Sequence, residues 1–156
     1  MSWDIVLMRF QDRLPVSFDG EQARRTLASH GARETEPGVA EITGDGVADI
    51  SFGDASSEIL VSVFVSSPAV TRLVYELARA MEMVVFFPTR ESWSAATASE
   101  ALRTELPDRS WGGWQDFHDD LDPPDPVVCH SASDLYSVLA PAYDEWAAWA
   151  NRSSEP

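Results

Sequence analysis

The sequence predicts an α+β fold: a mostly antiparallel sheet of about five strands, with packed helices and a C-terminal aromatic-rich extension plus helix. Residues 58–88 show a buried strand, an amphipathic helix and a second buried strand in succession. Residues 38–53 form two short alternating runs joined by a glycine-containing turn, which is a hairpin pattern. Together these two observations predict an antiparallel meander that leads into the main helix.

The 156 residues have the length of one ordinary domain, and 44% of them are hydrophobic, enough for a core. We expect residues 1–106 to form the α+β core and residues 107–130 an ordered acidic and aromatic extension. Residues 131–151 are expected to form a C-terminal helix.

Alternation and helix capping predict the N-terminal elements. Residues 3–10 have the pattern of a buried strand, and residues 12–16 are expected to turn around Pro15. Asp19 has Gln22 three positions later, a capping-box spacing that predicts the start of a helix. Gly31 is a typical residue for the end of that helix, whose thin apolar face suggests a place at the edge of the sheet.

The next segment is expected to change from loop to sheet. Residues 33–38 read as a polar loop. Residues 38–43 and 47–53 alternate as two strands around Gly44-Asp45-Gly46, which predicts a hairpin. With the strand that follows, they make a three-stranded meander.

The central strand–helix–strand unit supplies most of the predicted core. Residues 59–65 are apolar on both alternating faces, so we expect both faces of this strand to be covered. Ser67 offers an N-cap hydroxyl and Pro68 suits the first helical position. The apolar run at residues 83–87 predicts another interior strand. If the two strands share a sheet in parallel, the crossover between them should be right-handed.

After Pro88 the pattern weakens. Residues 89–96 are expected to be irregular, with Trp93 at the margin of the core. Thr97 and Glu100 have capping-box spacing and predict a helix that Pro107 ends.

The C-terminal third combines an aperiodic stretch with a long helix. Residues 107–126 lack any period but carry large aromatic side chains, so we expect an ordered excursion over the domain. Residues 127–130 predict a short edge strand, and Pro141 is expected to kink the final helix. The expected buried side of that helix comprises Leu135, Val138, Leu139, Ala142, Trp146, Trp149 and Ala150.

Charge is the most unusual global property of the chain. There are 26 acidic and 11 basic residues, all of the latter arginine, for a formal net charge of −15. Nucleic acids and anionic membrane surfaces need a basic footprint, so we exclude them as partners and expect a basic protein instead. Solubility is the alternative explanation of the acidity. The absence of a membrane-spanning run and the lone Cys129 predict a cytoplasmic protein.

A group of aromatic and acidic residues is the predicted partner-binding surface. Tryptophan is favoured at interface hot spots, and an acidic rim would steer a basic protein toward it. The alternative is a hydrophobic flap that caps the domain's own core. The residues are Trp111, Trp114, Phe117, Asp119, Asp120 and Asp122.

Metal and cofactor chemistry finds little support in the sequence. The acidic stretch 118–125 has ligands suited to hard cations, but an EF-hand counted from Asp120 fails, because Asp125 and Ser131 replace the required glycine and glutamate. We therefore expect no metal and no cofactor.

Two candidate catalytic arrangements have simpler explanations. Cys129 and His130 are adjacent on an expected strand and so point to opposite faces, which favours a buried structural cysteine. Glu41 and Asp49 face each other across the hairpin, where ordinary solvent-facing residues belong. The chain contains no nucleotide-binding, hydrolase or metalloprotease motif.

The first two-thirds of the chain contain four runs in this order: W-D-I-V-L-M-R-F, A-D-I-S-F-G, V-S-V-F-V-S-S-P-A-V-T-R-L-V-Y-E-L-A-R-A-M and V-V-F-F-P-T. This layout resembles that of small uncharacterised bacterial α+β proteins. Some of these are acidic immunity proteins against antibacterial toxins. The likeness is one of size, acidity and element order, so it transfers no functional residue, and it ends at Pro107. Such relatives commonly turn from helix to strand through a glycine, where this chain has Glu82.

The sequence thus favours a non-enzymatic role in which an acidic surface binds a basic partner, such as a toxin. The alternative is a small-molecule binding or sensing domain with a pocket between the main helix and the aromatic extension. A third possibility is a metal-dependent enzyme built around Asp120. A homodimer is compatible with all three.

Overall fold

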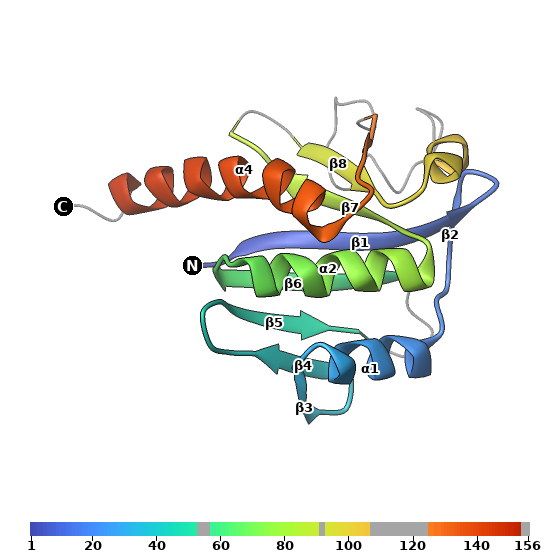
Figure 1. Cartoon of the computed structure of the whole chain (residues 1–156), viewed down its shortest axis with the longest axis horizontal. Helices are drawn as coiled ribbons and strands as arrows, with labels where there is room; N and C mark the ends of the chain where they lie inside the picture. Colours follow the sequence, from blue (N-terminus) through green and yellow to red (C-terminus); the bar gives the residue numbers. More distant parts are fainter. Residues whose placement is uncertain (53–56, 91–92, 107–124, 154–156) are drawn as a thin grey trace.

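The protein is α+β, as predicted, and its sheet is larger than predicted (Figure 1). The computed structural model describes residues 1–52, 57–90, 93–106 and 125–153. Within these residues the strands form one nine-stranded sheet instead of about five strands. The strands are β1 (Trp3–Gln11), β2 (Leu14–Val16), β3 (Arg33–Glu36), β4 (Val39–Ile42), β5 (Val47–Ser51), β6 (Glu58–Val65), β7 (Met83–Pro88), β8 (Trp93–Thr97) and β9 (Val127–Val128). The helices are α1 (Gly20–Ser29), α2 (Pro68–Met81), the 3₁₀ helix η1 (Glu100–Glu105) and α4 (Ala132–Ser153).

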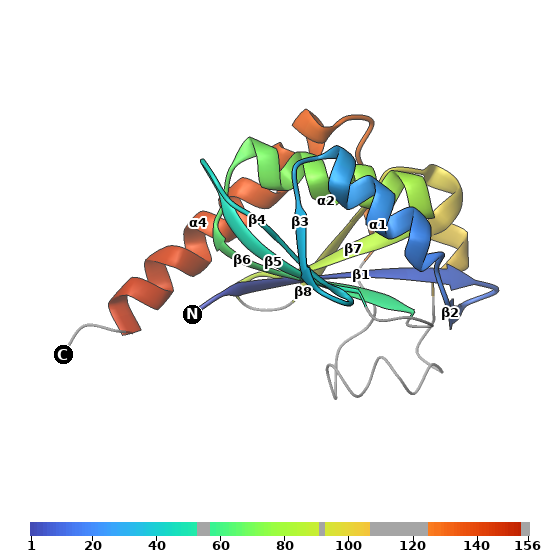
Figure 2. The ribbon, with the colours of Figure 1, turned by 90° about the horizontal axis from the view of Figure 1, so that it is seen from below.

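The sheet is mixed, with the order β3-β4-β5-β6-β1-β7-β8-β9 and β2 paired to β1. Among the described strands, every pairing is antiparallel except β8 with β9. Helices α1, α2 and α4 lie together on one side of the sheet (Figure 2). We call the side that these helices cover the inner face and the other side the outer face.

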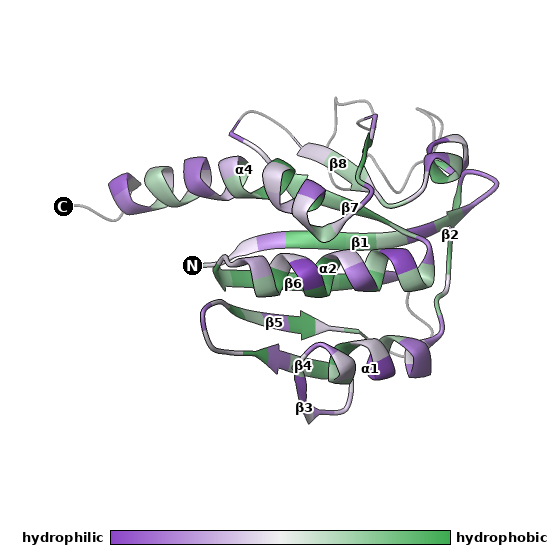
Figure 3. Cartoon of the chain, in the orientation of Figure 1, coloured by the Kyte–Doolittle hydropathy of each residue, from purple (hydrophilic) through white to green (hydrophobic). Residues whose placement is uncertain are grey.

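The predicted unit of strand, helix and strand is present at the centre of the sheet as β6, α2 and β7. Both strands pair antiparallel with β1, which lies between them, so β6 and β7 are parallel without being neighbours. The hydropathy colouring shows the resulting apolar band along β6, β1 and β7 (Figure 3).

The prediction that both faces of the strand at 59–65 are covered is wrong. Ile59, Val61 and Val63 are buried under the helices, whereas Leu60 is 36% exposed and Phe64 41% exposed on the outer face. Apolar residues on both faces of a strand normally indicate double coverage, and here Leu60 and Phe64 are not fully covered on the outer face of β6. By contrast, residues 83–87 of β7 are buried throughout, as predicted.

Three strands were missed because their sequences lack the usual signals. Strand β2 follows Asp12 and Arg13, whose φ angles of 52° and 67° make a two-residue hairpin turn, so the chain turns there and not around Pro15. Strand β3 replaces the expected loop at 33–38, and its residues are all exposed and polar because it is an edge strand. Strand β8 replaces the irregular segment expected at 89–96. Trp93 packs, as expected, at the margin of the core, against a buried cluster of Val6, Met8, Phe10, Val84, Phe86 and Ala95.

The first predicted capping box is formed in part, and the second is not formed. The Asp19 carboxylate accepts the N–H groups of Glu21 and Gln22 at 3.0 and 3.3 Å, which caps α1. The Gln22 amide does not return to the cap, because it donates instead to the carbonyl of Ala80 at 3.0 Å and ties α1 to the end of α2. Thr97 lies in β8, so the second box is not formed and a 3₁₀ helix follows.

The close approach of the β4–β5 turn to α2 explains the glycine at its end. A Cβ atom on Gly46 would lie 2.2 Å from Ser67 Oγ and 2.7 Å from a methyl carbon of Val70. Ser67 Oγ caps α2 by accepting the Val70 N–H at 3.2 Å. The predicted hairpin and the predicted helix cap therefore meet at one buried contact.

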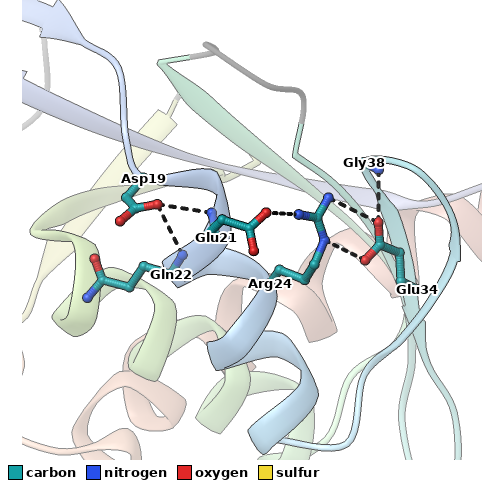
Figure 4. Close-up of polar contacts among 6 residues, drawn as sticks. All are labelled: Asp19, Glu21, Gln22, Arg24, Glu34 and Gly38. Atoms are coloured by element: carbon teal, nitrogen blue, oxygen red, sulfur yellow. Dashed lines mark hydrogen bonds and ion pairs between the residues drawn. The ribbon is translucent and has the colours of Figure 1, made fainter.

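Polar contacts attach α1 to the edge hairpin (Figure 4). The Arg24 guanidinium contacts Glu21 and donates two hydrogen bonds to Glu34 on β3, at 2.7 and 3.2 Å. Glu34 also accepts the N–H of Gly38 at 3.3 Å. Arg24 thereby holds the pKa of Glu34 below its ordinary value, with the Gly38 hydrogen bond as a smaller cause.

Helix α4 is packed in its first half and extends past the sheet in its second. Ser131 Oγ accepts the Asp134 N–H at 3.1 Å, which starts the helix at the predicted residue. Leu135 and Leu139 are buried as predicted. The second half projects beyond the strands (Figures 1 and 2), and Trp149 is 51% exposed, so its predicted burial is wrong.

Three further outcomes concern the C-terminal region. Pro141 lies inside α4, and the kink expected there stays a prediction. The predicted edge strand is present as β9. The extension at 107–124 lies outside the described residues. In the part of the chain that the structure describes, no helix combines the length and apolar character needed to cross a membrane.

Candidate functional site

The six residues predicted to bind a partner lie outside the described residues. They are Trp111, Trp114, Phe117, Asp119, Asp120 and Asp122. Two other surfaces have the features of binding sites. One is on the outer face of the sheet and the other lies between α4 and the end of β7.

The first surface, which we call the acidic sheet face, comprises Asp4, Glu41, Asp49, Glu58, Leu60 and Phe64. The strand register places Asp4 opposite Ser62, Ser62 opposite Asp49, and Asp49 opposite Glu41. Since directly opposed residues lie on the same face, three carboxylates share one row across β1, β6, β5 and β4. Glu58 lies on the same face of β6, four residues from Ser62.

The row of carboxylates has an electrostatic cost that the fold offsets only in part. Like charges directly opposite each other destabilise a sheet, and Glu41 and Asp49 are such a pair. Arg33 continues the row on β3 and forms an ion pair with Glu41 at 2.8 Å. Asp49 is exposed at the centre of the row. Its position is that of a solvent-facing charge rather than of a catalytic acid or base.

Exposed apolar side chains accompany these charges. Leu60 and Phe64 flank Ser62 on the outer face of β6, and both are among the exposed large hydrophobic residues. The Phe64 carbonyl accepts the hydroxyl of Tyr143 at 3.1 Å, which fixes the backbone at this point. The acidic sheet face therefore presents an apolar pair beside a row of carboxylates.

The second surface, which we call the aromatic cleft, has a volume of about 440 Å³. Thr89 and Arg90, which follow β7, line one side, and Glu145, Trp146 and Trp149 of α4 line the other. Of the residues with described positions, the cleft therefore brings together two indoles and one charge of each sign. The pocket predicted between the main helix and the aromatic extension stays a prediction, because residues 107–124 of that extension lie outside the described residues. The aromatic cleft is a different site, on α4.

Trp3 fixes both sides of the aromatic cleft. Its indole N–H donates to the carbonyl of Pro88 at 3.1 Å, one residue before Thr89. Its ring packs edge-on against Tyr143, with ring centroids 5.7 Å apart, and Tyr143 lies 5.8 Å from Trp146. Because Trp3 is only 2% exposed, this support is part of the core.

Cys129 is buried, as predicted. Its side chain is 1% exposed, and its N–H donates to the carbonyl of Thr97 at 2.8 Å. Burial raises the pKa of the thiol, and the nearby Asp134 carboxylate adds to the effect. A thiol held in its protonated form is a poor nucleophile, and His130 beside it is exposed.

Metal-ligating side chains do not gather in groups of three or more among the residues with described positions. Asp125, the last residue of the acidic stretch, forms an ion pair with Arg103 at 2.6 Å. The rest of that stretch, including Asp120, lies outside the described residues. The expectation that the chain uses no metal or cofactor stays a prediction.

Comparisons of the chain with protein-family models, with curated proteins and with solved structures find no match.

Proposed function

We propose that the protein binds a basic protein partner through the acidic sheet face. The observation that carries this proposal is the exposed pair Leu60 and Phe64 beside the row of carboxylates that includes Asp49. Apolar anchors with a charged surround are the composition of a protein interface rather than of a solvated sheet surface.

The charge of the whole chain supports the same kind of partner. A formal net charge of −15 repels anionic partners and speeds the approach of cationic ones. The resemblance to acidic immunity proteins makes a cationic toxin one such partner. The role is non-enzymatic binding.

The placement of like charges is a second support. Glu41 and Asp49 face each other although opposed like charges destabilise a sheet by about 0.2–1 kcal/mol. We therefore expect Asp49→Asn to raise the free energy of unfolding by a similar small amount and to weaken binding. A variant that gains stability while it loses binding distinguishes a functional residue from a structural one.

The test compares two double variants with the same change in charge. Asp49→Asn with Phe64→Ser alters the acidic sheet face. Asp144→Asn with Tyr136→Ser makes a matched change on α4, where both residues are exposed. The wild type and each variant are used to capture proteins from a bacterial lysate. Any basic protein that the wild type retains is then purified, and its affinity for the wild type and for the two variants is measured.

We expect the sheet-face variant to bind the purified partner at least about tenfold more weakly, which corresponds to losing about 1.4 kcal/mol at a hot spot. The α4 variant is expected to bind within about twofold of the wild type. Equal weakening by both variants would show that charge alone drives binding. Retention of no basic protein would contradict the proposal.

A further inference from the structure

The aromatic cleft has the size and composition of a small-molecule site. Its volume of about 440 Å³ lies within the range of about 300–1,000 Å³ that is usual for ligand pockets. Among the described residues, its lining combines two tryptophan side chains with Thr89, Arg90 and Glu145. The indole of Trp149 is 51% exposed and so offers a large apolar surface to a ligand.

Two features hold parts of the cleft in place before a ligand binds. Trp146 packs on Tyr143, whose hydroxyl donates to the Phe64 carbonyl and whose ring packs on Trp3. The opposite side begins one residue after Pro88, whose carbonyl accepts the Trp3 indole N–H. A ligand that enters therefore does not have to order the side chain of Trp146 or the end of β7.

The two charged side chains among the described residues of the lining restrict the chemistry of the ligand. A ligand with only a positive charge would pair with Glu145 but would be repelled by Arg90 and leave it without a partner. A ligand with only a negative charge would be repelled by Glu145 and by the formal net charge of −15. An uncharged ligand would give neither side chain a partner.

We propose that the aromatic cleft binds a zwitterionic amino-acid-like ligand that carries an aromatic side chain. The ligand carboxylate pairs with Arg90, which can form two parallel hydrogen bonds to it. The ligand ammonium group pairs with Glu145. Its aromatic ring stacks on the indoles of Trp146 and Trp149. This site is separate from the acidic sheet face and does not depend on the function proposed for it.

The test uses L-phenylalanine and two matched probes that each lack one charge. Phenethylamine has the ammonium group without the carboxylate, and 3-phenylpropanoate has the carboxylate without the ammonium group. Binding is followed by NMR through the indole N–H signals of the ¹⁵N-labelled protein, with Trp146→Phe and Trp149→Phe used to assign the two cleft signals.

We expect L-phenylalanine to shift both cleft signals in a saturable manner, with a Kd on the order of 1 mM or tighter. Each probe with one charge is expected to bind about tenfold more weakly, because one side chain of the cleft loses its partner. Failure of the two signals to shift at about ten times that concentration would overturn the proposal. Equal binding of phenethylamine and L-phenylalanine would also overturn it.

Two exposed substitutions test the role of each charge. In Arg90→Gln, L-phenylalanine should bind no better than phenethylamine binds the wild type. In Glu145→Gln, it should bind no better than 3-phenylpropanoate binds the wild type. An unchanged Trp3 indole signal shows that each variant retains the fold around the cleft. Unchanged affinity in both variants would contradict the assigned contacts.

Discussion

Replacement of Gly46 by alanine tests the packing of the β4–β5 turn against the start of α2. The new Cβ would lie 2.2 Å from Ser67 Oγ, 2.8 Å from Ser67 Cβ and 2.7 Å from a Val70 methyl carbon. Because Gly46, Ser67 and Val70 are all buried, the contact cannot be relieved by rotation into solvent.

Two costs add in this variant. Overpacking of a buried site costs about 1–3 kcal/mol. Displacement of Ser67 also breaks the cap in which its Oγ accepts the Val70 N–H, and loss of such a cap costs about 0.5–2 kcal/mol. We therefore expect Gly46→Ala to lower the free energy of unfolding by about 1.5–5 kcal/mol, measured by urea denaturation with circular dichroism.

A second substitution identifies the clash as the cause. Ser67→Gly removes two of the three contacting atoms and costs only a few tenths of a kcal/mol, since glycine is an acceptable N-cap. The double variant should therefore be more stable than the sum of the single effects predicts, by about 1 kcal/mol or more. Gly44→Ala is the control. Its new Cβ would meet no atom within 4 Å, and its cost comes only from backbone strain at φ +124°. Because it does not contact Ser67, its effect on the free energy of unfolding should add to that of Ser67→Gly. Additivity of Gly46→Ala with Ser67→Gly would refute the reasoning.

Three other predictions concern stability and reactivity. Glu82→Gly should raise the free energy of unfolding, measured in urea, by about 0.5–1 kcal/mol, because Glu82 ends α2 with a left-handed φ of 53° that glycine adopts without strain. The substitution removes only an exposed ion pair with Arg9 at 3.8 Å. A lower free energy of unfolding would contradict this prediction. Arg24 lowers the folded pKa of Glu34, so this carboxylate stabilises the fold above its unfolded pKa and stops doing so as the pH falls through the folded pKa. Glu34→Gln should therefore be less stable than the wild type at pH 7 and equally stable at the acid end of a urea series, and a difference that persists in acid would exclude the ion pair as its cause. Cys129 should react with a thiol reagent at least about 100-fold more slowly in the native protein than in urea, and fast native labelling would show that it is not buried.

The sequence predicted those elements whose patterns reflect burial on one side. Strand β1, the β4–β5 hairpin, α2 with its cap and β7 all have a period or a capping residue that the structure confirms. Strand β3 has four exposed polar residues. It is a strand because it pairs with β4, and no periodic pattern in its own sequence indicates that pairing. The turn before β2 uses Asp12 and Arg13 in left-handed conformations that usually favour glycine or asparagine.

The acidic sheet face was missed for a related reason. Leu60 and Phe64 have the same residue types as buried positions, so alternation alone assigned them to a covered surface. The pairing of Glu41 with Asp49 was predicted correctly. Asp4 joins the same row because β1 pairs with β6, which is distant in the sequence, and no local pattern predicts that register. The aromatic cleft depends on where α4 meets the end of β7, which sequence patterns do not specify. Only the helical spacing of Trp146 and Trp149 indicated that α4 has an aromatic side.

The association rate of the purified basic partner, measured as a function of salt concentration, tests the central claim most directly. We predict that the rate falls steeply as salt rises and that the sheet-face variant Asp49→Asn with Phe64→Ser dissociates faster than the wild type at every salt concentration. The matched α4 variant should dissociate at the wild-type rate. An association rate that does not change with salt, or equal dissociation rates for the wild type and the sheet-face variant, would contradict the proposal that the acidic sheet face binds a basic protein.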